Sequence, residues 1–238
     1  MKKTTVLIAL SLLWIAAGCH ANEIQADTWS EKNFITLPPD AMFLLMDLDK
    51  AKPLFKKDLS NAVCEEGGWD YDKGVLTATG KGDIWSEDEY GDFLLALEFR
   101  CVSDTNSGVF LRCNDLDDWI NTAIEVQILQ DNEGVKNTRH RCGGIFDCVT
   151  PRTPELKELG EWNEFVILAK GSHIYVLLNG TQVTGMDLDK WTEAGKNPDG
   201  SRNKFKNAYK DMSRVGRVGL QYHGQDISFR NMRILVLD

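Results

Sequence analysis

The stretch His173-Ile-Tyr-Val-Leu-Leu-Asn-Gly-Thr-Gln-Val-Thr184 decides the fold class of this 238-residue chain. Two runs rich in β-branched, aromatic and aliphatic residues, 173–179 and 181–184, meet at Asn179-Gly180. Asn-Gly between apolar runs is a strong hairpin signal, because both central positions of the two-residue turn need positive φ. The stretch therefore predicts a pair of antiparallel strands.

Similar short runs recur along the chain, separated by glycine, asparagine and aspartate. With the hairpin they give roughly nine predicted strands, at 74–79, 93–102, 108–113, 123–129, 164–169, 173–179, 181–184, 216–222 and 227–236. Stretches with helical periodicity are few. The pattern predicts an all-β jelly-roll β-sandwich of two antiparallel sheets, formed as one domain by residues 53–238.

The first residues have the composition of an export signal. Two lysines precede an apolar run, 6–15, and small residues follow it up to Cys19. The stretch Ile15-Ala-Ala-Gly-Cys19 resembles a bacterial lipobox, in which Cys19 becomes the lipidated first residue, and a secretory signal cleaved after Ala21 is the alternative.

These features divide the N-terminal region into two parts. We expect residues 1–18 to be a lipoprotein signal peptide and residues 19–52 to be an N-terminal tether, in which the apolar run 41–48 docks on the domain. The protein is then exported to the periplasm or the outer membrane, and the lipid at Cys19 is its only link to a membrane.

Charge and cysteine content narrow the functions further. The chain has 36 acidic and 27 basic residues and a formal net charge of −9, which argues against sequence-independent nucleic-acid binding. Five cysteines follow Cys19, so in an oxidising compartment at least one thiol stays free or pairs with another chain. Two candidate disulfides, Cys101 with Cys113 and Cys142 with Cys148, cannot be decided from spacing.

The longest interruption between predicted strands is residues 186–214, which contain seven lysines and arginines among polar residues. A solvated surface loop is one interpretation. A flap over a binding face is the other, since long ordered loops in compact β domains often carry sites.

Alternation along a strand sorts side chains by face. Ile124, Val126 and Ile128 belong to one face, which we assign to the core, whereas Glu125 and Gln127 share the other. That second face is polar.

The same rule adds residues from two other predicted strands. Phe110 and Arg112 share one face of the run 108–113, and Gln221 and His223 oppose their apolar neighbours. If these strands belong to one sheet, a carboxylate, two amides, a guanidinium and an imidazole line a single concave surface, a mixture suited to sugars.

Each of these residues also has a simpler interpretation. Glu125 and Arg112 fit a solvated cross-strand ion pair, and Gln127 fits an exposed strand position. His223 precedes a glycine in a turn-like stretch, where a surface histidine is common. Trp85 fits a core position as readily as a stacking platform for a sugar.

The strand that carries Glu125 constrains the mechanism. Jelly-roll β-glucanases of the retaining class have Glu-x-Asp-x-Glu on such a strand, but here it reads Glu125-Val-Gln-Ile-Leu129 with a single carboxylate. A conventional glycoside hydrolase needs a second one within about 5 to 10 Å. Glu98, opposite in parity to its apolar neighbours, is the candidate.

Several motifs in a shared order resemble the 3-keto-disaccharide hydrolase domain family, a concanavalin-like jelly roll, from about residue 53 to the C-terminus. The residues that carry the resemblance are Pro53-Leu-Phe55, Glu89-Tyr-Gly-Asp-Phe93, Asn106-Ser-Gly-Val-Phe-Leu-Arg112, Glu125-Val-Gln-Ile-Leu129, Gly160-Glu-Trp-Asn163, Leu178-Asn-Gly180, Gly219-Leu-Gln-Tyr-His-Gly224 and Phe229-Arg-Asn-Met-Arg-Ile234. Where the family often has Gln-Asp-His-Gly, this chain has Gln221-Tyr-His-Gly224.

The resemblance implies cleavage of glycosides whose C3 hydroxyl a partner enzyme, a glycoside 3-dehydrogenase, has oxidised to a ketone. Such elimination needs one base, one acid and a donor for the enolate oxygen. We assign Glu125 and His223 as the acid/base pair and Arg112 as the enolate donor, a role that a divalent metal could also fill.

The remaining assignments are hydroxyl binders and alternatives. Gln127 and Gln221 are predicted to bind sugar hydroxyls, and His140 is a reserve candidate in the site. No cofactor is implied with certainty. A non-catalytic carbohydrate-binding lipoprotein would show the same fold and polar face, and conventional hydrolysis through Glu98 and Glu125 is the third possibility.

Overall fold

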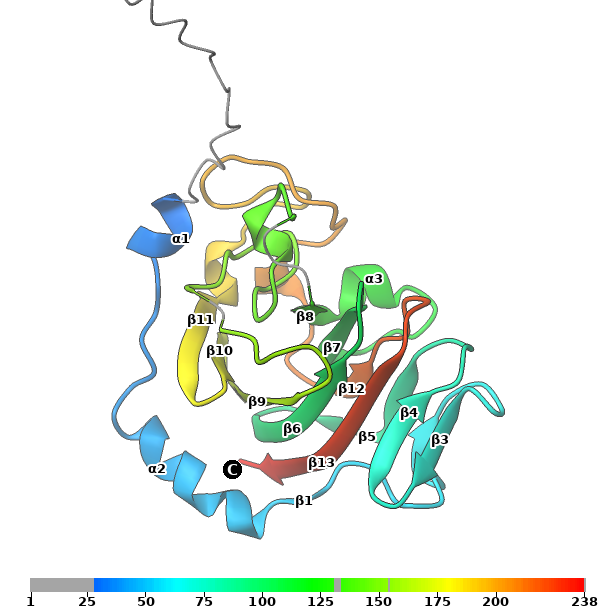
Figure 1. The fold of residues 1–238 in the computed structure, drawn as a ribbon. Coiled ribbons are helices and arrows are strands. Elements are labelled where there is room, and N and C mark those ends of the chain that lie inside the picture. The colour runs from blue at the N-terminus through cyan, green and yellow to red at the C-terminus, as the bar shows by residue number, and fades with distance from the viewer. Residues whose placement is uncertain (1–27, 131–133, 154, 238) are drawn as a thin grey trace, which may run out of the picture.

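A computed structural model describes residues 28–130, 134–153 and 155–237 as two antiparallel β-sheets packed face to face (Figure 1). The larger sheet has the strand order β11-β10-β9-β6-β13-β4-β3, with β1 also paired to β13, and the smaller one has the order β2-β5-β12-β7-β8. The predicted all-β sandwich is confirmed. Because several connections cross from one sheet to the other, strands distant in sequence become neighbours, such as β6 and β13.

The strands have the following bounds. The eight-stranded sheet contains β1 (Lys52–Pro53), β3 (Trp69–Asp72), β4 (Val75–Ala78), β6 (Phe93–Cys101), β9 (Trp162–Lys170), β10 (His173–Leu178), β11 (Thr181–Asp187) and β13 (Ile227–Val236). The five-stranded sheet contains β2 (Ala62–Val63), β5 (Ile84–Tyr90), β7 (Asn106–Cys113), β8 (Ile124–Leu129) and β12 (Gly216–Leu220). The helical turns are α1 (Thr28–Lys32), α2 (Ala41–Met46), α3 (Trp119–Thr122), η1 (Asp47–Lys50), η2 (Thr138–His140), η3 (Leu188–Lys190) and η4 (Tyr209–Asp211).

All nine predicted strands are present, and the Asn179-Gly180 turn joins β10 to β11 with both residues at positive φ. The short strands β1, β2 and β3 and the longer strand β5 were not predicted. In β5 the run Ser86-Glu-Asp-Glu89 resembles a surface loop in composition, yet the strand pairs with both β2 and β12.

The core lies between the sheets and follows the expected alternation. In β8 the side chains of Ile124, Val126 and Ile128 are fully buried there, and in β6 the residues of odd number supply the opposite side. Leu94 and Ala96 of β6 belong to a second apolar cluster on the outer face of the eight-stranded sheet. Each sheet therefore has one core face and one outer face.

The described part of the predicted tether packs against that outer face. Leu44, Leu45 and Leu48 cover Leu94 and Ala96, so the apolar run 41–48 docks on the domain as predicted. The predicted signal peptide and Cys19 lie outside the described residues. Within the described ranges, no helix is long and apolar enough to cross a bilayer.

Among the described residues, neither candidate disulfide is formed. Cys101 points into the core, whereas Cys113 belongs to the cluster on the outer face of the five-stranded sheet. The sheet itself therefore separates the first candidate pair. Cys142 and Cys148 are both buried in the core as thiols.

The long stretch between β11 and β12 is anchored rather than loosely solvated. Trp191, Phe205 and Tyr209 are buried in the core cluster, and Arg139 forms an ion pair of 2.6 Å with Asp199. In Figure 1 this segment, drawn in orange, lies beside the green loop that follows β8. The flap interpretation of residues 186–214 thus has a structural basis.

Candidate active site

One row of side chains crosses the outer face of the five-stranded sheet and ends at Glu125. Strand register aligns Trp85 on β5 with Gly219 on β12, then Phe110 on β7 and Glu125 on β8. Beyond β8 the row continues to Phe146, whose backbone N–H donates to the Glu125 carbonyl oxygen at 3.0 Å. The next row places Gln221, Gly108 and Gln127 side by side. Glu125, Gln127 and Gln221 thus share one face, as the alternation indicated, and Trp85 lies on the same face.

Glycines make room in these rows. A Cβ atom at Gly108 would lie 2.8 Å from Oε1 of Glu125, and one at Gly219 would lie 2.4 Å from the Trp85 ring. Such distances are far below van der Waals contact, so the carboxylate and the indole lie flat over backbone. Only glycine at these two positions allows both side chains to adopt these positions.

Glu125 is buried without a compensating partner. Its side chain is 6% exposed, and no hydrogen bond to its carboxylate occurs among the described residues. Burial raises the pKa of Glu125 to about 7, the positive charge of Lys204 opposes this shift, and the negative charge of Asp83 adds to it. A carboxyl group with such a pKa exchanges protons readily near neutral pH, which is the property that acid/base catalysis needs.

Two amide oxygens beside Glu125 also lack donors. Gln127 donates through Nε2 to Asn106 Oδ1 at 2.8 Å, but its Oε1 is buried without a hydrogen-bond partner among the described residues, as is Oε1 of Gln221. Oε1 of Gln225, in the loop after β12, is in the same condition. Buried acceptors without donors are costly, and sugar hydroxyls would satisfy them.

An aromatic cluster forms the other side of the row. The rings of Trp85 and Phe110 stack with centroids 5.0 Å apart, and Trp119 on α3 lies 4.8 Å from Phe110. Trp119 is only partly buried, so it presents an apolar edge of the kind on which a sugar ring packs. Trp85, at 6% exposed, is mainly a support for this cluster.

His223 lies at the exposed end of the second row. It follows Gln221 by two residues in the loop after β12, and its side chain is open to solvent. Asp83, just before β5, accepts a hydrogen bond from the Tyr222 backbone N–H at 2.9 Å and interacts electrostatically with His223. Burial raises the pKa of Asp83, and the Tyr222 N–H and His223 oppose that shift. His223 and Glu125 are thus linked through the charge of Asp83.

A lysine from the flap approaches Glu125 from the β8 side. The ammonium of Lys204 lies 4.1 Å from the ring centroid of Phe146, and its backbone N–H donates to Asp147 Oδ2 at 2.8 Å. His140 stacks on the same Phe146 ring, with ring centroids 4.2 Å apart, and its Nε2 is 3.1 Å from Asp147 Oδ1. His140 therefore supports Phe146 and Asp147 by stacking and hydrogen bonding.

Arg112 does not join this face, which corrects its predicted position. It has φ of +55° within an irregularity of the β7–β12 pairing, so the alternation that holds up to Phe110 fails there. The fully buried guanidinium donates to the carbonyl oxygens of Gly91 (2.9 Å) and Gly171 (2.7 Å) and to Asp92 Oδ1 (3.0 Å). Burial lowers the pKa of Arg112 to about 10, and Asp92 opposes this shift. Through these hydrogen bonds Arg112 links the turn at Gly91 and Asp92 to the turn at Gly171.

Glu98 does not lie near Glu125, as a second catalytic carboxylate would have to. It lies on β6 with the parity of Leu94 and Ala96, on the outer face of the other sheet, so the core separates it from Glu125. It accepts from Arg230 at 2.6 and 2.8 Å and from Asn231. Burial alone would raise the pKa of Glu98, but these hydrogen bonds outweigh it and lower the pKa.

Two functional candidates were missed from sequence. Lys204 is one of several cations in a polar stretch, and nothing in its local pattern distinguishes it. Asp83 follows Lys81-Gly82 in a turn before β5. The polar composition of β5 kept that strand from being predicted, so Asp83 could not be placed beside it. In the part of the chain that the structure describes, no three His, Cys, Asp or Glu side chains group as metal ligands.

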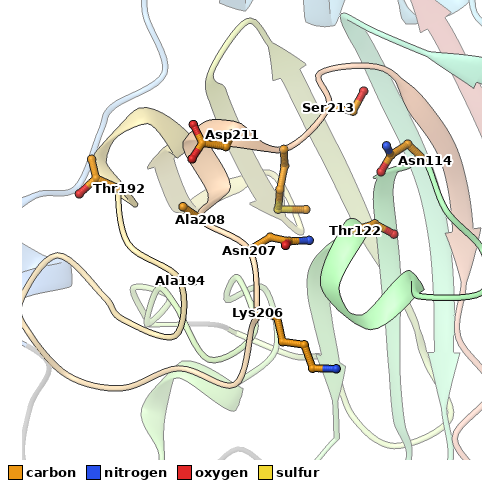
Figure 2. Close-up of a pocket in the computed structure, with 10 residues that line it drawn as sticks. Asn114, Thr122, Thr192, Ala194, Lys206, Asn207, Ala208, Asp211 and Ser213 are labelled. Carbon is orange, nitrogen blue, oxygen red and sulfur yellow. The ribbon is translucent and has the colours of Figure 1, made fainter.

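A separate pocket of about 520 Å³ lies on the other side of α3, between Thr122 and the flap (Figure 2). Its lining is mostly polar and includes Asn114, Asn207 and Asp211, which Figure 2 labels. None of the residues of the Glu125 face lines it. Its charged lining residues, Lys206 and Asp211, are both exposed, whereas Glu125 is buried.

A family model described as the 3-keto-alpha-glucoside-1,2-lyase-like domain matches residues 50–235. The chain belongs to this family. The match includes every residue of the Glu125 face described above. Members of such a family share a fold and a site location, whereas the roles of individual side chains follow from their chemistry.

Similar proteins with descriptive names agree with this family membership. The chain is 24% identical over 181 residues to a 3-keto-disaccharide hydrolase of Bacteroides thetaiotaomicron, which covers 66% of this chain, and it spans only 62% of that relative's length. A crystal structure from Parabacteroides distasonis, provisionally assigned as a glycosyl hydrolase, is 40% identical with a TM-score of 0.74, and the match covers 79% of this chain and 99% of that one. A second protein of the same organism and assignment is 26% identical, with a TM-score of 0.60 and coverage of 79% and 84%.

Proposed function

We propose that this protein cleaves the glycosidic bond of 3-keto-glycosides by elimination, with Glu125 as the base. The observation that carries the proposal is the state of Glu125, a buried carboxyl with no hydrogen-bond partner among the described residues, a pKa raised to about 7 and an ammonium group nearby. The family membership supports the choice of a 3-keto-glycoside as substrate.

The reaction suits a site with one general base. A C3 ketone acidifies the C2–H bond, so the base removes that proton and the electrons form the enolate of C2 and C3. The enolate then expels the aglycone oxygen from C1, which an acid protonates as the C1–O bond breaks and a C1=C2 double bond forms. Addition of water, with hydroxide to C1 and a proton to C2, completes net hydrolysis.

The arrangement of charges suggests which residue fills each role. The C2 proton and the C3 ketone oxygen are on adjacent carbons, so base and enolate donor must be close together, as Glu125 and Lys204 are. Lys204 therefore replaces Arg112 in that role. His223, at the open end of the face, is placed to protonate the leaving oxygen, and Gln127 and Gln221 accept from sugar hydroxyls.

Asp83 gives a conventional glycoside hydrolase mechanism as the second candidate function. It is a second carboxylate close enough to Glu125 to raise the pKa of that residue. The assignment of Glu98 to this role is not renewed, because Glu98 lies on the other sheet. A non-catalytic sugar-binding role remains as a distinct outcome of the experiment below.

The substrate implies a supplier and a location. An enzyme that oxidises the C3 hydroxyl of a glycoside, a glycoside 3-dehydrogenase, must act before this one. The lipobox-like stretch before Cys19 supports export and attachment to the envelope through lipid, where glycosides arrive from outside.

The test compares a glucoside with its 3-keto derivative at equal concentration, using protein that begins after Cys19 and measuring aglycone release. We expect release from the 3-keto compound only. Release from the unoxidised glucoside would instead favour Asp83 and Glu125 as a conventional pair. Ligand-induced NMR shifts without turnover of either compound would favour the binding role and contradict the proposal.

A further inference from the structure

The second row of the Glu125 face contains a glutamine whose amide orientation is fixed by its neighbours. Gln127 donates through Nε2 to Asn106 Oδ1 at 2.8 Å and to the Ile128 carbonyl oxygen at 3.3 Å. A backbone carbonyl can only accept, so the atom of Gln127 that faces Ile128 must be the nitrogen. The oxygen Oε1 therefore points the other way, where it is buried without a hydrogen-bond partner among the described residues. Asn106 lies two residues before Gly108 on β7 and shares its face.

Three polar groups converge on Gly108. This glycine pairs with Gln127 in the register of β7 and β8, and its carbonyl oxygen accepts from the Gln221 backbone N–H at 2.9 Å. The Glu125 carboxylate leans over the same glycine, since a Cβ atom there would lie 2.8 Å from Glu125 Oε1. Ser107 Oγ donates to the Gln221 carbonyl oxygen at 2.8 Å, which holds the end of β12 in place. The carboxylate and the two amide side chains thus meet over one stretch of backbone.

We propose that Asn106 is a positioning residue that fixes Gln127 as a hydrogen-bond acceptor, and that Gln127 and Gln221 require free hydroxyl groups at C4 and C6 of the sugar that carries the ketone. The assignment of these positions rests on the proposed function, which puts C2 of that sugar at Glu125. A hexopyranoside oxidised at C3 has its hydroxyl groups at C2, C4 and C6. Since C2 is the reacting carbon, the C4 and C6 hydroxyls are the donors left for the two amide oxygens.

This recognition restricts the substrate class. A sugar linked through C4 or C6 to a further unit has an ether oxygen at that position, which accepts hydrogen bonds but cannot donate one. An ether oxygen that faced Gln127 Oε1 would leave the buried acceptor without a donor, which lowers kcat/KM by about tenfold or more. The inferred substrate is therefore a glycoside whose ketone-bearing hexose is terminal and unsubstituted, and pentosides and sugars inside a 4- or 6-linked chain are excluded.

The test compares kcat/KM for a 3-keto-glucoside with the values for its 4-deoxy and 6-deoxy analogues. We expect the wild type to lose about tenfold or more with each analogue, because each leaves one amide oxygen without a donor. Gln127→Met removes the acceptor at nearly constant length, so it should reduce one of these losses to about twofold or less, and Gln221→Met should reduce the other. Gln182→Met, the same change in a glutamine of β11 that binds the tether, is the matched control and should leave both losses unchanged.

The role of Asn106 is tested through the same ratios. Asn106→Ala removes the shorter of the two bonds that orient the Gln127 amide, so the loss that depends on Gln127 should become smaller. Asn106→Asp keeps an acceptor for Nε2 and should retain the wild-type loss. A merely structural role for Asn106 would change kcat/KM for the three substrates by the same factor, and that result would overturn its assignment as a positioning residue.

Binding separates a failure of this inference from a failure of the proposed function. NMR titrations give the dissociation constants of the unoxidised glucoside and of its 4-deoxy and 6-deoxy forms. Weaker binding of both deoxy forms to a protein that cleaves no 3-keto-glycoside would refute the proposed function and leave the hydroxyl recognition intact. Cleavage of all three 3-keto compounds with equal kcat/KM would overturn the hydroxyl recognition and leave the proposed function intact.

Discussion

The two outer faces of the sandwich each present a glutamate from the middle of a strand, and the two residues are in opposite states. Glu98 on β6 is held by Arg230 and Asn231, and these hydrogen bonds lower its pKa against the effect of burial. Glu125 on β8 has no such bonds in the described structure, and burial raises its pKa to about 7. A satisfied carboxylate stabilises a fold, whereas an unsatisfied one is available for a proton.

The sheets differ in the same way at a larger scale. The outer face of the eight-stranded sheet is covered by α2 and an apolar cluster. The outer face of the five-stranded sheet has glycines under Glu125 and Trp85 and amide oxygens without donors. Polar groups left unsatisfied on one face, in a fold that satisfies them on the other, mark the place where a ligand completes the structure.

The largest expected effect follows from exchanging each carboxyl group for an amide. Glu125→Gln removes the base and should lower the turnover of a 3-keto-glycoside by about 10² to 10⁴-fold, the usual contribution of general base catalysis. Glu98→Gln should leave turnover within about twofold of wild type, because that residue is outside the site. Initial rates of aglycone release measure the turnover of both variants. Equal losses of turnover in Glu125→Gln and Glu98→Gln would contradict the assignment of different roles to the two residues.

Arg112 tests whether a buried charge in this fold is structural. Arg112→Met removes the hydrogen bonds that the guanidinium donates to Asp92 and to the carbonyl oxygens of Gly91 and Gly171, so it should lower the free energy of unfolding by about 3 to 5 kcal/mol. Arg233→Met, an exposed change, should cost about 0.5 kcal/mol or less. Denaturant unfolding checks both. An Arg112→Met protein that has normal stability but has lost activity would show that Arg112 acts in the active site.

The pH dependence of stability separates Glu125 from an ordinary surface acid. The pKa of Glu125 is about 7 in the folded protein, against an ordinary value of 4.5. Its neutral form therefore stabilises the fold fully below about pH 4.5, and that contribution is lost as the pH rises through 7. Glu125→Gln should therefore match the wild type near pH 4.5 and exceed its stability at pH 8 by up to about 3 kcal/mol. Unfolding curves at the two pH values measure this. A variant less stable at pH 8 would contradict the raised pKa.

The smallest effect belongs to Glu98. The Glu98–Arg230 pair is partly exposed, with side chains 23% and 38% accessible, so solvent screens it. Glu98→Gln should lower the free energy of unfolding by about 1 kcal/mol or less near neutral pH, a change opposite in sign to that of Glu125→Gln at pH 8. The lowered pKa means that the loss disappears as the pH falls through the titration of Glu98. A gain in stability would show that Glu98, like Glu125, is an unsatisfied acid.

The strands and the polar face were predictable because they depend on local pattern. The alternation in Ile124-Glu-Val-Gln-Ile128 placed Glu125 and Gln127 correctly, since a regular strand keeps its parity. It failed at Arg112, where a residue other than glycine takes positive φ and ends the alternation. No sequence signal marks that irregularity.

Pairing between distant segments was the second limit. Parity for Glu98 was correct, but parity does not say which sheet a strand joins. Asp83 and Lys204 reach the Glu125 face from a turn and from the flap, and their positions depend on contacts with Tyr222 and Phe146. Such residues become visible only when the chain is folded.

The measurement that tests the central claim most directly is deuterium incorporation at C2 of the sugar when a 3-keto-glycoside is cleaved in D₂O, followed by NMR and compared with an enzyme-free control. The account predicts C2 deuterium above the control with the wild type and with Glu98→Gln, and none above it with Glu125→Gln. Aglycone release without C2 deuterium, or unchanged incorporation in Glu125→Gln, would contradict proton abstraction by Glu125.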